Sequence, residues 1–178
     1  YEGFGVYNLV DNTLRLMPIT FRGQHIEPPK TDDYQRGLRD IRSVKTLSDF
    51  TTQEQTELKG LLESTDRGAH YYGDFYHSGY ESSLIDMKDQ YFITNTVRAL
   101  KRVNHTLYVY DASGFMIIDL DNRRIQGFFN NRLGGEGPKG VPDSLRGHYG
   151  TDFTMIYALS KLDPKDLEIL WTMRKQYL

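Results

Sequence analysis

Hydrophobic and polar residues alternate in several short segments at the start of the chain, and a period of two predicts β-strands. Residues 5–10 and 13–16 show this pattern on either side of Asp11 and Asn12, which favour a turn. A further strand is expected over residues 19–22, which end in a charged residue followed by glycine. The first part of the chain is therefore predicted to be rich in strands.

The second half of the chain contains four more segments with strand patterns. Residues 106–111 alternate, and residues 115–120 are apolar enough for a central strand. Residues 153–159 and 167–173 are expected to be strands on either side of a turn that contains Pro164. Residues 122–150 hold seven glycines and two prolines, so they are expected to be irregular, and a connection that long is usually functional or mobile.

Helical patterns are fewer. Thr51 and Glu54 have the spacing of a capping box, ahead of a helix expected to reach about Glu63. Residues 67–79 are rich in Gly, Tyr and His and are expected to form a loop, and a second long helix is expected over residues 86–102. Few helices and many strands without β-α-β alternation predict an α+β fold, in a single domain over residues 1–178.

Composition excludes several classes of function. The chain has 178 residues, enough for a full hydrophobic core, and its net charge of −2 offers no basic footprint for nucleic acid. No apolar run is long enough to span a membrane. The absence of cysteine rules out disulfides and thiolate metal sites, and the five histidines lack metal-ligand spacing, so no metal site is predicted. A chain that begins with tyrosine rather than methionine suggests a trimmed chain or a mature secreted form.

Two stretches carry candidate chemistry. Arg22 ends a predicted strand, where a buried arginine needs an anion such as a ligand phosphate, and Gly23 would let a ligand approach closely. The alternative is an ordinary surface arginine on an edge strand. Ser82 and Ser83 lie at a predicted strand end leading into a helix, where hydroxyls orient polar side chains or hold a ribose or amide. The alternative is that these serines cap the following helix.

Three short motifs, taken in order, resemble one family. The first is a strand ending in Arg22, followed by a proline pair at 28–29 and a short helix ending near Gly37. The second is residues 80–84, an aromatic residue followed by serines that lead into a helix. The third is residues 157–171, a small apolar run, a turn and a segment that ends in tryptophan. The chain resembles the catalytic A subunits of heat-labile enterotoxin and cholera toxin, which are mono-ADP-ribosyltransferases of the arginine-serine-glutamate type.

The resemblance implies a fold and an NAD site. It implies an ADP-ribosyltransferase-like fold, with two packed, mostly antiparallel sheets around an NAD cleft and helices at their flanks. Arg22, beside Gly23, would hold the phosphates of NAD. Ser82 would orient the catalytic glutamate, with Ser83 supporting it.

The third motif departs from the family pattern, because its two glutamate positions fall on Phe153 and Met155. Neither side chain accepts a charge-assisted hydrogen bond, and loss of such stabilisation costs orders of magnitude in rate. We therefore expect a secreted, toxin- or effector-like protein that has lost catalysis and acts by binding a host or target protein. One alternative is an active transferase with Glu136 or Asp152 as the relocated acid. Another is an unrelated α+β binding domain.

Overall fold

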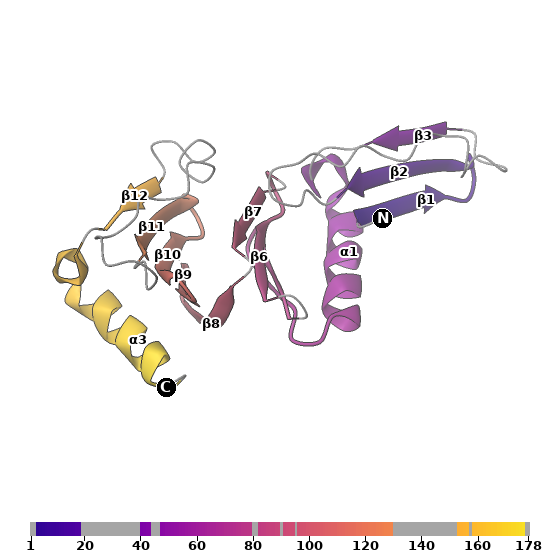
Figure 1. Ribbon diagram of the computed structural model, residues 1–178. Coiled ribbons are helices and arrows are strands. Elements are labelled where there is room, and N and C mark those ends of the chain that lie inside the picture. The colour runs from indigo at the N-terminus through magenta and orange to yellow at the C-terminus, as the bar shows by residue number, and fades with distance from the viewer. Residues whose placement is uncertain are drawn as a thin grey trace. The chain divides into compact units, whose positions relative to one another are not determined.

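The fold is a mixed α+β structure with mostly antiparallel sheets, as the sequence predicts (Figure 1). The computed structural model describes residues 3–18, 40–43, 47–79, 82–89, 91–94, 96–129, 153–156 and 158–176. The chain divides into two compact units, Tyr1–Tyr80 with Ile85–Phe92 and Glu81–Leu84 with Ile93–Leu178. The single domain expected over residues 1–178 stays a prediction.

The first unit begins with the predicted hairpin. Strands β1 (Gly3–Asn8) and β2 (Thr13–Pro18) pair antiparallel, and β2 pairs in parallel with β3 (Asp40–Ser43). Asn12 has a φ of 63°, a left-handed conformation that asparagine tolerates better than most residues. The strand expected over residues 19–22 and the short helix expected before Gly37 lie outside the described residues.

Helix α1 (Thr52–Thr65) confirms the predicted capping box. The Thr51 hydroxyl accepts a hydrogen bond from the Glu54 amide at 3.3 Å, and the Glu54 carboxylate accepts one from the Thr51 amide at 2.9 Å. Arg15 of β2 donates to the other oxygen of the same carboxylate, which ties the hairpin to the start of the helix. The hydrogen bond from Arg15, more than any other cause, lowers the pKa of Glu54 below its ordinary value.

Replacing Thr51 with alanine tests this cap. The Thr51→Ala variant should lose about 1 kcal/mol of the free energy of unfolding, because it leaves a helix amide without its acceptor. Urea unfolding followed by far-UV circular dichroism measures the change. Thr56→Ala is the matched control, since the Thr56 hydroxyl bonds only the Thr52 carbonyl within the helix and alanine favours helix. An equal loss in both variants would contradict the capping role.

Residues 70–78 form a hairpin, so the prediction of a loop over residues 67–79 is wrong for most of that segment. Strands β4 (His70–Tyr72) and β5 (Phe75–Ser78) pair antiparallel across a turn at Gly73 and Asp74, and Gly73 has a φ of 63°. A Gly-Asp pair between two aromatic-rich runs is a hairpin signal that the high glycine and histidine content obscured. These strands belong to a four-stranded sheet in the order β4-β5-β6-β7.

The helix predicted over residues 86–102 is also wrong. This part of the chain forms strands β6 (Ser83–Asp86), β7 (Tyr91–Thr94) and β8 (Val97–Val103). All four residues of β7 are aromatic or β-branched, a composition that favours a strand. At the start of β8, buried Val97 and Ala99 flank exposed Arg98, which is the alternation of a strand and differs from the predicted helical period.

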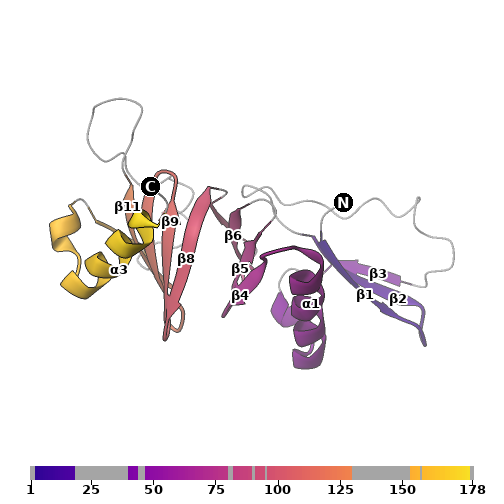
Figure 2. The ribbon, with the colours of Figure 1, turned by 90° about the horizontal axis from the view of Figure 1, so that it is seen from below.

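The core of the first unit lies around α1. Leu58 is the buried residue of the helix and packs in one cluster with residues from β2, β5 and β6 and from the 3-10 turn Leu47–Asp49. Figure 2 shows α1 between the β1–β3 sheet and strands β4 and β5. The buried members of the cluster are Met17, Leu47, Phe50, Leu58, Ala69, Tyr76, Ile85 and Met87.

The second unit contains a five-stranded sheet in the order β12-β11-β10-β9-β8. Strands β9 (Thr106–Asp111) and β10 (Gly114–Asp119) confirm the predicted pair and its turn. Strand β11 (Arg124–Phe129) corrects the expectation that residues 122–150 are irregular, and the residues after 129 in that segment are not described. Strand β12 (Phe153–Met155) pairs in parallel with β11 and is shorter than the strand predicted there.

The strand predicted over residues 167–173 is a helix, α3 (Pro164–Lys175), which packs against the sheet (Figure 1). Asp163 caps it by accepting the Lys165 amide at 2.9 Å, and Pro164 occupies the first helical turn. The Tyr108 hydroxyl of β9 donates to Asp166 at 2.7 Å and joins helix to sheet. Burial first, and then this hydrogen bond, raises the pKa of Tyr108 above its ordinary value.

Candidate functional site

Most of the predicted NAD site lies outside the described residues. This holds for Arg22 and Gly23, which were expected to hold the NAD phosphates, and for Glu136 and Asp152, the two candidate acids. Of the residues assigned to that site, the structure places Ser82 and Ser83.

The two serines precede a strand instead of a helix. Ser82 has a φ of 53°, and its carbonyl accepts a hydrogen bond from the Val97 amide at 3.0 Å. Ser83 is 1% exposed and is the first residue of β6. No helix follows them in the described residues 82–89, so the interpretation of this pair as a helix cap is wrong. Backbone placement is the role that the described contacts give to Ser82.

The two positions at which the resemblance places glutamates lie on β12, at the edge of the second unit's sheet. Phe153 is half-buried and pairs with Ile125, and Met155 pairs with Gly127. Both positions are therefore part of the sheet, paired with β11.

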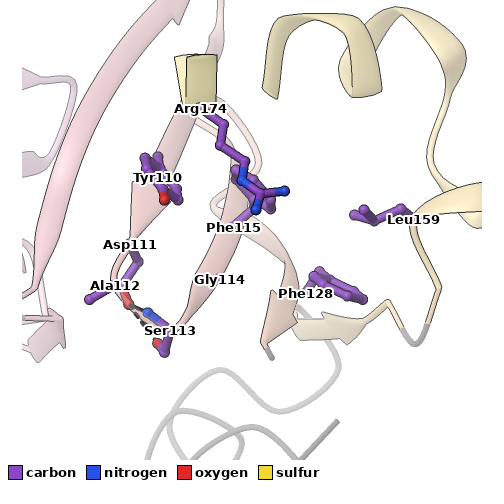
Figure 3. A pocket seen from close by; sticks show the side chains of 9 residues that line it. All are labelled: Tyr110, Asp111, Ala112, Ser113, Gly114, Phe115, Phe128, Leu159 and Arg174. Carbon is purple, nitrogen blue, oxygen red and sulfur yellow. Dashed lines mark hydrogen bonds between the residues drawn. The ribbon is translucent and has the colours of Figure 1, made fainter. Parts of the chain in front are cut away.

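A pocket opens beside the turn between β9 and β10, wholly within the second unit (Figure 3). Its volume is about 180 Å³. The turn, the strand β11, the 3-10 turn Leu159–Lys161 and the last turn of α3 contribute its walls. The lining residues are Tyr110, Asp111, Ala112, Ser113, Gly114, Phe115, Phe128, Leu159 and Arg174.

The walls of this pocket are aromatic and aliphatic, with one cation. The rings of Tyr110 and Phe115 stack with centroids 5.2 Å apart, and Phe128 and Leu159 lie across from them (Figure 3). Arg174 reaches from α3 toward Phe115 in the same view. Its guanidinium also lies over the Trp171 ring, 5.1 Å from the centroid. No carboxylate among the described residues forms an ion pair with Arg174.

Asp111 holds the turn that forms the other end of the pocket. Its side chain is 1% exposed. One carboxylate oxygen accepts the Ser113 amide at 2.8 Å and the Ser113 hydroxyl at 2.5 Å. The other accepts the hydroxyls of Thr94 at 2.5 Å and Thr96 at 2.7 Å. A carboxylate satisfied by four donors is a structural clamp, and it has little capacity left to act as a general base.

The size and chemistry of the pocket limit what it receives. Small-molecule sites commonly span about 300–1,000 Å³, and this pocket of about 180 Å³ is smaller. It has room for a single side chain against the aromatic wall, with an anion or a carbonyl on Arg174. No group of three or more His, Asp or Glu in the described part of the chain is placed to hold a metal ion. Among those residues, no helix is long and apolar enough to cross a membrane.

The sequence predicts the turn beside this pocket but not the pocket. Tyr110 and Phe115 flank the predicted turn at 112–114, and aromatic residues on both sides of a hairpin turn are a signal that was present. Leu159 ends one segment with a strand pattern, and Arg174 directly follows another. Their approach to the turn depends on the packing of α3 against the sheet, which the sequence pattern does not state.

The chain matches no protein-family model, and comparisons with curated proteins and with solved structures find no match. The resemblance to the enterotoxin A subunits therefore stays a prediction from short motifs.

Proposed function

We propose that this chain is a protein-binding domain, in which the pocket beside Asp111 receives one apolar side chain of a partner. The observation that carries the proposal is the pocket itself, which has aromatic walls, a volume of about 180 Å³ and a guanidinium at its rim. Interfaces are commonly anchored by a few side chains in such pockets, and arginine and aromatic residues are enriched among the anchors.

The two parts of the pocket would recognise two features of the partner. Burial of a leucine- or phenylalanine-sized side chain against Tyr110 and Phe115 stabilises a complex by about 1.5–3 kcal/mol. A carboxylate next to that side chain would form a charge-assisted hydrogen bond with Arg174, which contributes about 1.5–3 kcal/mol. The partner segment is therefore expected to carry a large apolar residue beside Asp or Glu.

For the resemblance to ADP-ribosyltransferases, too, we propose binding without catalysis. In that reading the chain is a secreted, toxin- or effector-like protein of this ancestry that has lost NAD turnover. The order of the motifs and the apolar residues at Phe153 and Met155 support it. The strands β7 and β8, where the resemblance implied a helix, and α3, where it implied a strand, count against it. The proposal of a binding pocket does not depend on this ancestry.

Selection from a displayed peptide library tests the binding proposal. The selected peptides should share a large apolar residue next to an acidic one. Their affinity should fall at least about tenfold for Arg174→Glu, because the substitution replaces the attraction with repulsion. Arg98→Glu is the matched control, since Arg98 is exposed on β8 of the same unit and the substitution changes the charge by the same amount. Equal binding by wild type and Arg174→Glu would contradict the proposal.

An NAD hydrolysis assay tests the loss of catalysis separately. We expect no turnover above the uncatalysed rate. Turnover that Arg22→Ala abolishes would restore the transferase alternative. In that case Glu136→Ala and Asp152→Ala would identify which acid is used.

A further inference from the structure

The tip of the β1–β2 hairpin exposes two aliphatic side chains that nothing above explains. Leu9 is 84% exposed and Val10 is 96% exposed, and the neighbouring Tyr7 is 44% exposed. Tight turns usually carry Gly, Asn, Asp or Ser at such positions. Single exposed aliphatic residues are ordinary, but two adjacent ones in a hairpin turn form a small exposed apolar patch.

Hydrogen bonds hold this tip in one shape. The Asn8 side chain accepts the Val10 amide at 2.9 Å, and the Asn8 carbonyl accepts the Asn12 amide at 3.0 Å. The Asp11 carboxylate accepts the Thr13 amide at 3.1 Å and the Thr13 hydroxyl at 2.6 Å. Because the backbone is already ordered, the tip would lose little conformational entropy on docking.

The charge beside the tip points to a basic site and away from a lipid surface. Asp11 is exposed next to Val10. The one cation among residues 5–17 is Arg15, which is paired with Glu54. Attachment of an apolar patch to anionic lipid is normally assisted by lysine or arginine beside it. The tip instead presents an aliphatic side chain next to a carboxylate.

That combination matches the pocket of the second unit. We propose that the occupant of the pocket is the hairpin tip of a second copy of this chain, with Leu9 or Val10 against the aromatic wall and Asp11 on Arg174. The pocket has the volume for one such side chain, and Arg174 has no carboxylate partner among the described residues. This inference rests on the binding role proposed above for the same pocket.

Each chain carries one tip and one pocket, so the contact is not between identical patches. Two chains could exchange tips and close a symmetric pair, or the contacts could continue from chain to chain. In both arrangements the tip acts as the anchor of a larger interface. Self-association is therefore the property to measure.

Sedimentation equilibrium of the full chain, over a range of concentrations up to about 1 mM, tests the inference. Wild type should associate, and the double substitution Leu9→Ser with Val10→Ser should weaken association at least about tenfold. Both side chains are exposed, so the fold should be retained. Leu61→Ser is the matched control, because Leu61 is 59% exposed on α1 and is not part of the hairpin. This control should associate like wild type.

A double-mutant cycle tests the proposed pairing of charges. Asp11→Asn keeps the oxygen that accepts from Thr13 and removes the charge. Asp11→Asn and Arg174→Gln should each weaken association, and together they should weaken it by less than the product of the two effects. Independent effects would overturn the pairing.

Two results would overturn the inference. One is a wild-type chain that stays monomeric throughout the concentration range, and the other is association that the tip substitutions leave unchanged. If selected peptides still bind through Arg174, the inference fails while the proposed binding function stands. If neither peptides nor a second copy bind, both fail.

Discussion

Replacing Asp111 with alanine should destabilise the second unit by about 3 kcal/mol or more. The substitution removes the acceptor for the hydroxyls of Thr94, Thr96 and Ser113 and for the Ser113 amide. Hydrogen bonds to a charged group contribute about 1.5–3 kcal/mol each, and less where water can replace the acceptor, as at exposed Thr96 and Ser113. The turn held by Asp111 would lose its geometry as well. Urea unfolding followed by Trp171 fluorescence measures the effect, since the one tryptophan of the chain lies in α3 of this unit.

Two further variants test whether the loss of stability comes from the Asp111 carboxylate. Asp121→Ala removes an exposed carboxylate that bonds His105, both in turns between strands of the same sheet, and it should change stability little. Asp111→Asn keeps one acceptor oxygen and should lose less than Asp111→Ala. If Asp111→Ala unfolds at the same urea concentration as Asp121→Ala, the carboxylate is not a clamp.

Replacing Gly79 with alanine should destabilise the first unit by about 3 kcal/mol or more. An added Cβ would lie 1.9 Å from the Arg67 carbonyl oxygen and 2.6 Å from the Gly68 carbonyl carbon. Both are backbone atoms, which cannot move aside as the end of a flexible side chain could. Urea unfolding followed by far-UV circular dichroism, which reports the helix content, measures the loss.

Gly60→Ala provides a control of opposite sign. Gly60 lies in α1, and an added Cβ there would meet no atom within 4 Å. Alanine in an exposed helix interior is favoured over glycine by about 0.5–1 kcal/mol, so this variant should be more stable than wild type. Equal stability of the two variants would contradict the close approach of the chain at Gly79.

The sequence predicts those parts of the fold in which the residue types and their spacing indicate the same element. The capping box at Thr51 and Glu54 predicted α1, and the Asp11–Asn12 turn predicted the first hairpin. Short apolar runs were ambiguous, because a run of about seven residues fits a strand as well as a buried helix. The run at 167–173 has the pattern of a strand, but Asp163 and Pro164 before it form an ordinary helix start.

The pocket was less accessible to sequence reasoning than the fold. Tyr110 and Phe115 are neighbours through the register of a hairpin that the sequence predicts. Phe128, Leu159 and Arg174 join them only because β11 pairs with β10 and α3 packs on the sheet. Such contacts depend on tertiary packing, so a pattern of a few residues does not contain them.

The most direct test of the binding role is a nuclear magnetic resonance titration of the isotope-labelled chain with a selected peptide. We expect the Leu159 methyl and Arg174 side-chain resonances to shift together as the pocket fills, while the exposed Leu61 methyls stay in place. Shifts that leave Leu159 and Arg174 unchanged while the peptide binds would contradict it.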